Sequence, residues 1–288
     1  MDGANCSLVR LDGLDSLRPI APVRVEVTAR DLAASQQYVV EQEAQRQRTF
    51  GSGVLTAAIR ATAPTVDGTL DDWTGAGWVE IDRRGDGANF NSDAKPYNIL
   101  GALAASGDRL YAAWDTGEPK LLTNSGELPN AMFKTGGALD LMLGTNLAAN
   151  PDRREPVAGD LRLLVTQGGQ ETKATLYRQV APGALAADKV PFSSPWRTVA
   201  FDQVKDVSDQ VQLAADGKGH YEISVPLSLL GLQPKPGTKL KGDLGILRGN
   251  GTETTARSYW SNKATGITAD VPSEVMLTPN LWGAVEWK

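Results

Sequence analysis

Short segments in which apolar and polar residues alternate, each ended by a turn, constrain the fold of this chain most strongly. Residues 138–144 (Ala-Leu-Asp-Leu-Met-Leu-Gly) and 221–225 (Tyr-Glu-Ile-Ser-Val) show the two-residue period of a strand with one buried face. Dipeptides such as Asn250-Gly251, which favour tight hairpin turns, separate segments of this kind. Roughly a dozen such strands after residue 54, without an internal repeat, predict an all-β, antiparallel, jelly-roll-like β-sandwich.

The first 60 residues carry a different pattern and are predicted to form an N-terminal extension of strand, polar helix and strand. Residues 23–28 alternate as a strand does, and Asp31 is placed to N-cap a helix that runs to about residue 48. Because most side chains of this helix are polar, we expect it to lie on a surface or to contact another domain of a longer polypeptide. Residues 54–60 form the second strand, and the sandwich is expected to span residues 61–288.

Composition and charge exclude several classes of function. The chain has 288 residues and a formal net charge of −5, and it contains no basic run, so a nucleic-acid partner is not expected. No apolar stretch reaches the roughly 18 residues of a membrane helix, and no charged segment followed by an apolar one marks a signal peptide. The single cysteine, Cys6, excludes an intrachain disulfide. With one histidine, His220, the chain also lacks the three or four ligands of a zinc site.

The segment at residues 63–73 (Ala-Pro-Thr-Val-Asp-Gly-Thr-Leu-Asp-Asp-Trp) opens the predicted sandwich. Pro64 favours extended backbone before it, and Asp67-Gly68 favours a tight turn. An acidic pair then precedes Trp73. Three further motifs follow in order, at residues 110–115 (Leu-Tyr-Ala-Ala-Trp-Asp), 226–232 (Pro-Leu-Ser-Leu-Leu-Gly-Leu) and 281–283 (Leu-Trp-Gly).

In this order and spacing, the four motifs resemble those of family 9 carbohydrate-binding modules and their DOMON-like relatives. The resemblance covers about residues 61–288, with long loops at 83–96, 117–137 and 145–159 that exceed those of compact members. It implies a sandwich that binds sugars, in which two tryptophans clamp a sugar ring and a calcium ion is often bound structurally. Membership of this group would make a polysaccharide or an oligosaccharide the partner.

Tryptophans beside polar loops are the predicted ligand-binding residues, because an indole face stacks on the apolar C–H face of a sugar. Trp73, Trp114, Trp282 and Trp287 are expected to pack in the core. The candidate ligand-binding tryptophans are Trp78, Trp196 and Trp260. Trp260 stands in the densest cluster of recognition-like residues, with Arg257, Tyr259, Asn262 and Lys263. A hairpin end with one packed tryptophan remains the alternative interpretation of this cluster.

Carboxylates near the opening motif are the predicted metal ligands. Asp67, Asp71 and Asp72, joined by Asp115 or Asp140, would supply oxygen ligands to a structural calcium ion, which takes about six to eight of them. The spacing matches no EF-hand, so the fold would have to assemble the site. Asp67 has a simpler alternative role, which is to stabilise its own turn.

Taken together, these patterns predict a non-catalytic carbohydrate-binding module of a larger secreted protein that acts on polysaccharides, located outside the cell or in the periplasm. An accessory domain that docks on a neighbouring domain or chain is the alternative. Two further alternatives are a haem-binding DOMON-type domain and a glycoside hydrolase. The haem domain would use His220, Met132, Met142 or Met276 as axial ligand, and the hydrolase would use Asp140 and Glu222 as its carboxylate pair.

Overall fold

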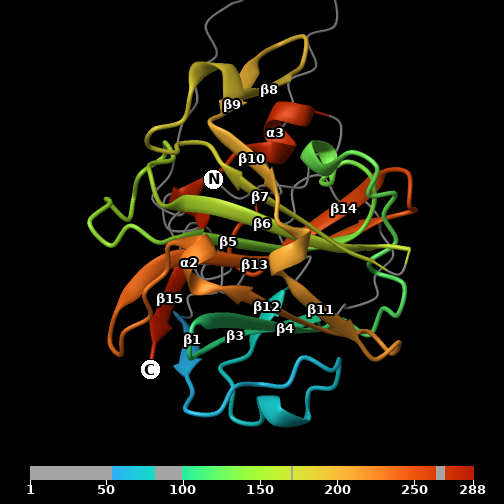
Figure 1. Cartoon of the computed structure of the whole chain (residues 1–288), viewed down its shortest axis with the longest axis vertical. Coiled ribbons are helices and arrows are strands. Elements are labelled where there is room, and N and C mark those ends of the chain that lie inside the picture. The colour runs from blue at the N-terminus through green and yellow to red at the C-terminus, as the bar shows by residue number, and fades with distance from the viewer. Residues whose placement is uncertain (1–53, 82–98, 170, 264–269) are drawn as a thin grey trace, which may run out of the picture. The chain divides into compact units, whose positions relative to one another are not determined.

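The computed structural model describes residues 54–81, 99–169, 171–263 and 270–288, and these form an all-β fold, as predicted (Figure 1). The strand predicted at 23–28, the helix predicted to start at Asp31 and the loop at 83–96 lie outside the described residues. Within the described residues, no helix has the length and apolar character needed to cross a membrane.

Fifteen strands and two short helices make up the described fold. The strands are β1 (Val54–Ile59), β2 (Val79–Ile81), β3 (Ile99–Ser106), β4 (Arg109–Asp115), β5 (Ala138–Gly144), β6 (Asp160–Gly168), β7 (Glu171–Arg178), β8 (Val190–Ser193), β9 (Thr198–Phe201), β10 (Gln203–Asp206), β11 (Gln212–Ala215), β12 (His220–Pro226), β13 (Lys239–Gly249), β14 (Thr254–Tyr259) and β15 (Gly283–Trp287). The helices are α2 (Leu227–Leu230) and α3 (Val271–Val275). Helix α2 occupies the motif at 226–232, where a single helical turn between Pro226 and Gly231 is expected.

Two sheets stack on each other and share strand β1 (Figure 1). The first sheet has the order β10-β7-β6-β5-β13-β15-β1, and β14 also pairs with β13. The second sheet has the order β1-β3-β4-β12-β11, and β2 also pairs with β3. Strand β1 is parallel to β15 along its first part and parallel to β3 at its end, whereas the other pairings among the described strands are antiparallel. Strand β1, which the sequence predicts as the last strand of the extension, is thus paired into both sheets of the sandwich.

The main core lies between the two sheets and follows from the alternation in the strands. Leu139, Leu141 and Leu143 of β5 face inward and join Trp114 of β4 and Trp287 of β15 in one buried cluster. All four tryptophans expected in the core, at 73, 114, 282 and 287, are at most 2% exposed. The prediction of their burial is confirmed.

The outer face of the first sheet carries a second apolar cluster, which a β-hairpin and a helix cover. Phe133 and Tyr177 pack there against Phe192 of β8 and Phe201 of β9, with ring centroids 5.5 Å apart between the two hairpin phenylalanines. Figure 1 shows the β8–β9 hairpin and α3 above this sheet. This face is therefore closed by protein and is not a free surface.

The outer face of the second sheet is covered by the opening motif. Trp73 packs against Tyr111 and the alanines of β3 and β4. Its indole Nε1 donates a hydrogen bond of 2.6 Å to Glu222 Oε1, while Glu222 Oε2 accepts from Gly68 N at 2.8 Å and Asp67 N at 3.1 Å. One buried carboxylate of β12 thus fixes the turn and the tryptophan of this motif to the sheet.

Candidate functional site

The cluster around Trp260, the strongest prediction of a ligand-binding surface, is buried in the structure. Trp260 is 4% exposed, and Arg257, Tyr259 and Asn262 are each 1% exposed. Trp260 points into the main core, where its ring contacts the backbone at Gly283 so closely that a side chain there would overlap it. The prediction that these side chains are accessible to a sugar is wrong, and the alternative of a packed hairpin end holds.

Arg257 and Tyr259 instead belong to a buried ionic network on the outer face of the first sheet. Arg257 Nη2 donates to Glu274 Oε2 of α3 at 2.6 Å, and Tyr259 OH donates to Asp140 Oδ2 at 2.6 Å. Arg162 Nη2 also donates to Asp140, at 2.6 Å, and its Nη1 donates to the backbone oxygen of Glu274 at 2.7 Å. Burial raises the pKa of Tyr259, so its phenol stays protonated and keeps donating. These side chains hold α3 on the sheet and offer nothing to a ligand.

Trp196 is accessible but stands apart from the other predicted residues. It lies in the turn between β8 and β9 and is 88% exposed, the highest value among the large apolar side chains described. The next residue, Arg197, anchors the turn by donating from Nη2 to Ser273 Oγ of α3 at 2.5 Å. This hairpin covers the outer face of the first sheet, whereas Trp78 belongs to the cluster on the outer face of the second sheet. The two indoles therefore cannot clamp one sugar ring between them.

Trp78 lines a hollow of about 490 Å³ next to the second sheet, called the Trp78 hollow below. Its ring is partly exposed and lies 6.0 Å from that of Trp73, tilted by 53°. The opening motif, the start of β3, the end of β4 and the turn between β11 and β12 meet here. The other lining residues are Thr69, Leu70, Asp71, Leu100, Asp115, Asp216, Lys218 and His220. Three predicted site residues, Trp78, Asp71 and Asp115, thus share one hollow.

A histidine between two carboxylates forms one wall of the Trp78 hollow. His220 Nδ1 lies 2.9 Å from Asp216 Oδ2, and its Nε2 lies 3.6 Å from Asp115 Oδ1. Asp216 Oδ1 also accepts from Lys218 N at 2.7 Å and from His220 N at 3.2 Å. Burial opposes ionisation of Asp216, but these backbone donors and the nearby charges of His220 and Lys218 outweigh it and lower its pKa. The wall therefore presents a carboxylate, an imidazole and a second carboxylate side by side.

Sequence reasoning did not identify Asp216, Lys218 and His220 as members of this site. The segment Asp216-Gly217-Lys218-Gly219 forms the turn between β11 and β12. Its neighbours in space depend on the pairing of β12 with β4, which sets His220 opposite Asp115. One local feature could have indicated the pair: Asp216 and His220 are four residues apart across a tight turn, which brings their side chains together.

The four predicted calcium ligands do not form one cluster: Asp67 and Asp72 bind the backbone of their own segment, and Asp71 and Asp115 line the Trp78 hollow. Asp67 Oδ1 accepts from Thr69 N and Thr69 Oγ1, both at 2.8 Å, which is its alternative role. Asp72 Oδ2 accepts from Thr65 N at 2.6 Å, while Asp71 and Asp115 line the Trp78 hollow. No three His, Cys, Asp or Glu side chains in the described ranges are grouped so that they could hold a metal ion. Calcium binding stays a prediction that rests on the resemblance.

The carboxylate pair of the glycosidase alternative does not meet in space. Asp140 lies on the outer face of the first sheet, where Arg162 and Tyr259 bind it. Glu222 lies on the outer face of the second sheet under Trp73, so the main core separates the two carboxylates. They cannot flank one glycosidic bond.

The side chains named as haem ligands are also dispersed. Met132 and Met142 are buried in the apolar cluster on the outer face of the first sheet, and His220 lies between two carboxylates at the Trp78 hollow. Met276 follows α3.

Several solved structures are similar to this chain, whereas no profile of a protein family and no curated protein matches its sequence. One is a family 9 carbohydrate-binding module from Caldicellulosiruptor kristjanssonii in complex with cellotriose, at 15% identity and a TM-score of 0.47, covering 81% of this chain and 93% of that chain. A family 9 module from the same organism in complex with glucose has 13% identity and a TM-score of 0.45, covering 81% and 95%. A protein from Bacteroides uniformis has 11% identity and a TM-score of 0.45, covering 82% and 99%. Likeness of this size carries no argument about the ligand of this chain.

Proposed function

We propose that this chain is a non-catalytic carbohydrate-binding module and that the Trp78 hollow is its binding site. The observation that carries this proposal is the convergence of one partly exposed indole with Asp71, Asp115, Asp216 and His220 on a single hollow. An indole face attracts the C–H face of a pyranose ring, and carboxylates and imidazole bind its hydroxyl groups. A volume of about 490 Å³ falls in the range of roughly 300 to 1,000 Å³ that is typical of small-molecule sites.

The charge of the lining indicates which sugars fit. Three aspartates, one lysine and one histidine surround the space, so acceptors for hydroxyl groups dominate. Neutral sugars supply hydroxyl donors to these acceptors, whereas the carboxylates disfavour an anionic sugar at close range. The ligand that we propose for this site is therefore a neutral oligosaccharide or the exposed end of a neutral polysaccharide.

The wider context of the module is proposed from the sequence motifs. We propose that it is secreted, to the extracellular space or the periplasm, as part of a larger protein that acts on polysaccharides, and that a structural calcium ion stabilises it. Detection of the protein in the periplasmic or extracellular fraction of its source cells would support secretion. A rise in melting temperature on adding calcium to chelator-treated protein would support calcium binding.

Affinity electrophoresis in gels that contain neutral soluble polysaccharides tests the proposed site. Retardation is expected for the wild type and should be lost in Trp78→Ala, because removing the indole removes the stacking surface. Trp196→Ala is the matched control, since it deletes an indole that is more exposed but lies outside the hollow. Equal loss of retardation in both variants, or retention that survives Trp78→Ala, would contradict the assignment.

A second candidate function, docking on a neighbouring domain or chain, has one observation in its favour. The indole of Trp196 is 88% exposed on a hairpin that α3 anchors, away from the Trp78 hollow. Association of a neighbouring domain that Trp196→Ala weakens and Trp78→Ala leaves intact would support this function, independently of sugar binding.

A further inference from the structure

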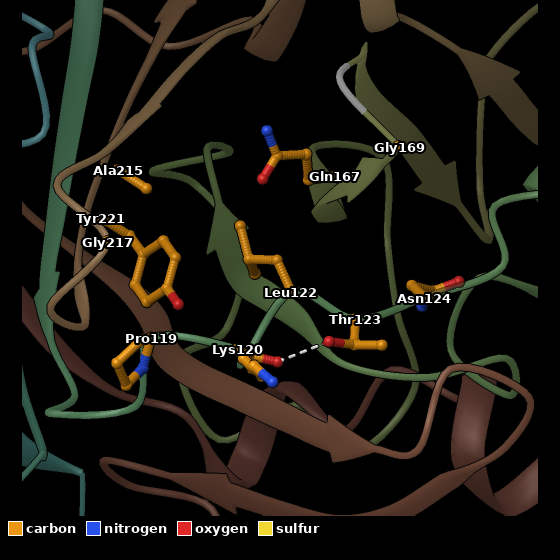
Figure 2. A pocket seen from close by; sticks show the side chains of 10 residues that line it. All are labelled: Pro119, Lys120, Leu122, Thr123, Asn124, Gln167, Gly169, Ala215, Gly217 and Tyr221. Carbon is orange, nitrogen blue, oxygen red and sulfur yellow. Dashed lines mark hydrogen bonds between the residues drawn. The ribbon is translucent and has the colours of Figure 1, made fainter.

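A second hollow, of about 510 Å³, lies on the other side of the turn between β11 and β12 and is called the Tyr221 hollow below (Figure 2). Asp216, Lys218 and His220 face the Trp78 hollow, whereas Ala215, Gly217 and Tyr221 line this one. Its far side is formed by residues of the segment 119–124 and by Gln167 and Gly169 at the end of β6. It therefore opens between an end of the first sheet and an end of the second.

The apolar base of the Tyr221 hollow is held firmly by the main core. Tyr221 and Leu122 are both members of that core, at 2% and 5% exposure. The phenol of Tyr221 donates to Glu118 O at 2.6 Å, and Thr166 Oγ1 donates to Leu122 O at 3.1 Å. The Tyr221 phenol and the Leu122 backbone thus have fixed partners, and the two buried side chains form a rigid floor of the hollow.

Most polar side chains around the Tyr221 hollow are already used by the fold. Asn124 Nδ2 donates to the backbone oxygens of Met132 and Gly137, and Asn124 Oδ1 accepts from Gly126 N and Thr135 Oγ1. Thr123 Oγ1 donates to Lys120 O at 2.8 Å, as the dashed line in Figure 2 marks. Such groups shape the hollow but have little capacity left for a ligand.

Two polar side chains at the Tyr221 hollow are left for a ligand. Lys120 and Gln167 are exposed, and neither side chain has a hydrogen bond or an ion pair to another described residue. In Figure 2 they lie on opposite sides of Leu122. A parallel bridge between Thr123 and Gln167 fixes the two rims relative to each other. An ammonium donor and an amide therefore stand on either side of this floor.

The charge of the Tyr221 hollow is opposite to that of the Trp78 hollow. Its lining contains Lys120 and no carboxylate, whereas three aspartates line the Trp78 hollow. The carboxylate of Glu118, next to the lining residue Pro119, is occupied by Arg248, which donates to it from Nε at 2.9 Å and from Nη2 at 2.7 Å. Lys120 therefore gives the described lining a positive charge, which attracts an anion.

We propose that the Tyr221 hollow binds the carboxylate of an acidic sugar residue, of the uronic acid type. The ammonium group of Lys120 pairs with the carboxylate and the amide of Gln167 binds hydroxyl groups, while Leu122 and Tyr221 form the closed floor below them. The preference for a sugar over another carboxylate rests on the proposed function of the chain. The preference for an anion rests on the lining of this hollow alone.

Amide chemical-shift titration of the full chain tests this proposal with glucuronic acid, glucose and acetate as probes at neutral pH. Glucuronic acid and glucose differ in the carboxylate, and acetate supplies a carboxylate without a ring. Saturable shifts of the Thr123 and Gly169 amides, which lie away from the turn shared with the Trp78 hollow, are expected with glucuronic acid at concentrations where the other two probes have little effect. Equal shifts with glucose would refute a role for the charge, equal shifts with acetate would refute sugar recognition, and the absence of any shift would overturn the site.

Two lysine variants make the result specific to the hollow. Lys120→Ala is expected to weaken glucuronic acid binding at least threefold, and Lys235→Ala, an exposed lysine outside both hollows, should leave it unchanged. If both variants weakened binding equally, the net charge of the protein and not Lys120 would explain the effect, and the proposal would be overturned. Trp78→Ala should not alter these shifts, so failure of the Trp78 hollow and failure of the Tyr221 hollow give different results.

Discussion

Replacing Glu222 by glutamine tests how the second sheet positions one wall of the Trp78 hollow. The carboxylate accepts three hydrogen bonds from the opening motif, from Trp73 Nε1, Gly68 N and Asp67 N. The segment that it fixes includes Leu70 and Asp71, which line the hollow. The variant Glu222→Gln keeps the size of the side chain but has one oxygen acceptor and an NH₂ group, which is a donor.

The expected loss in the free energy of unfolding follows from the hydrogen-bond donors and acceptors that remain in the variant. If the amide oxygen of the glutamine faces Gly68 N and Asp67 N, its NH₂ group meets the indole N–H of Trp73, and that buried donor loses its partner. An unsatisfied buried donor costs about 1 to 3 kcal/mol. Burial raises the pKa of Glu222, so relief from holding a desolvated charge offsets part of this cost. We expect a loss of about 2 kcal/mol, or about 4 to 8 °C in melting temperature for a domain of this size.

Thermal unfolding followed by circular dichroism measures this loss, and affinity electrophoresis measures its effect on the site. The matched control is Glu127→Gln, which removes an exposed carboxylate with no hydrogen bond to another described residue. Glu222→Gln is expected to lower both the melting temperature and the retention on neutral polysaccharide, and the control should alter neither. A melting temperature within 1 °C of the control would refute the reasoning, because the three hydrogen bonds would then carry no net stability.

Three further predictions concern groups that the fold buries or strains. Burial raises the pKa of Asp243 to about 7, above its unfolded value near 3.8, so its contribution to stability is complete below the unfolded pKa and is lost as pH rises through the folded value. In urea unfolding between pH 4 and 7, the free energy of unfolding should fall as pH rises, and Asp243→Asn should flatten that slope. The same slope in the variant would show that another group causes the pH dependence. Arg257→Ala removes one of two cationic partners of the buried Glu274, whose Oε1 still accepts from Lys134 Nζ at 2.8 Å. The loss in urea unfolding should therefore be about 3 kcal/mol, at the low end for a broken buried pair, and a loss under about 1 kcal/mol would count against the network. Gly68→Ala should destabilise more than Gly217→Ala, because both have positive φ but only a Cβ at Gly68 would lie within 2.5 Å of the backbone of Ala215; equal melting temperatures would contradict this.

The fold could be predicted because alternation within a strand is a local property of the sequence. On β5, Leu139, Leu141 and Leu143 face the main core, as their two-residue period requires. The turns at Asn250-Gly251 and Asp67-Gly68 could be predicted for the same reason, since each depends on the chemistry of two adjacent residues. The parallel pairing of β1 with β15 was missed, because it joins opposite ends of the described chain and leaves no local pattern.

The site could be predicted only in part, because alternation assigns a residue to one side of a sheet without indicating what covers that side. Tyr259 and Arg257 do face away from the main core, as an exposed recognition surface would require, but α3 and its Glu274 close over them. Trp78 directly precedes β2 and stays partly exposed because the ends of β4 and β12 and the opening motif leave a hollow beside it. Accessibility of an aromatic residue in this fold is thus decided by segments distant in sequence. For the same reason, a search for binding residues in similar sandwiches should start from the ends of strands and not from the density of polar and aromatic residues along the chain.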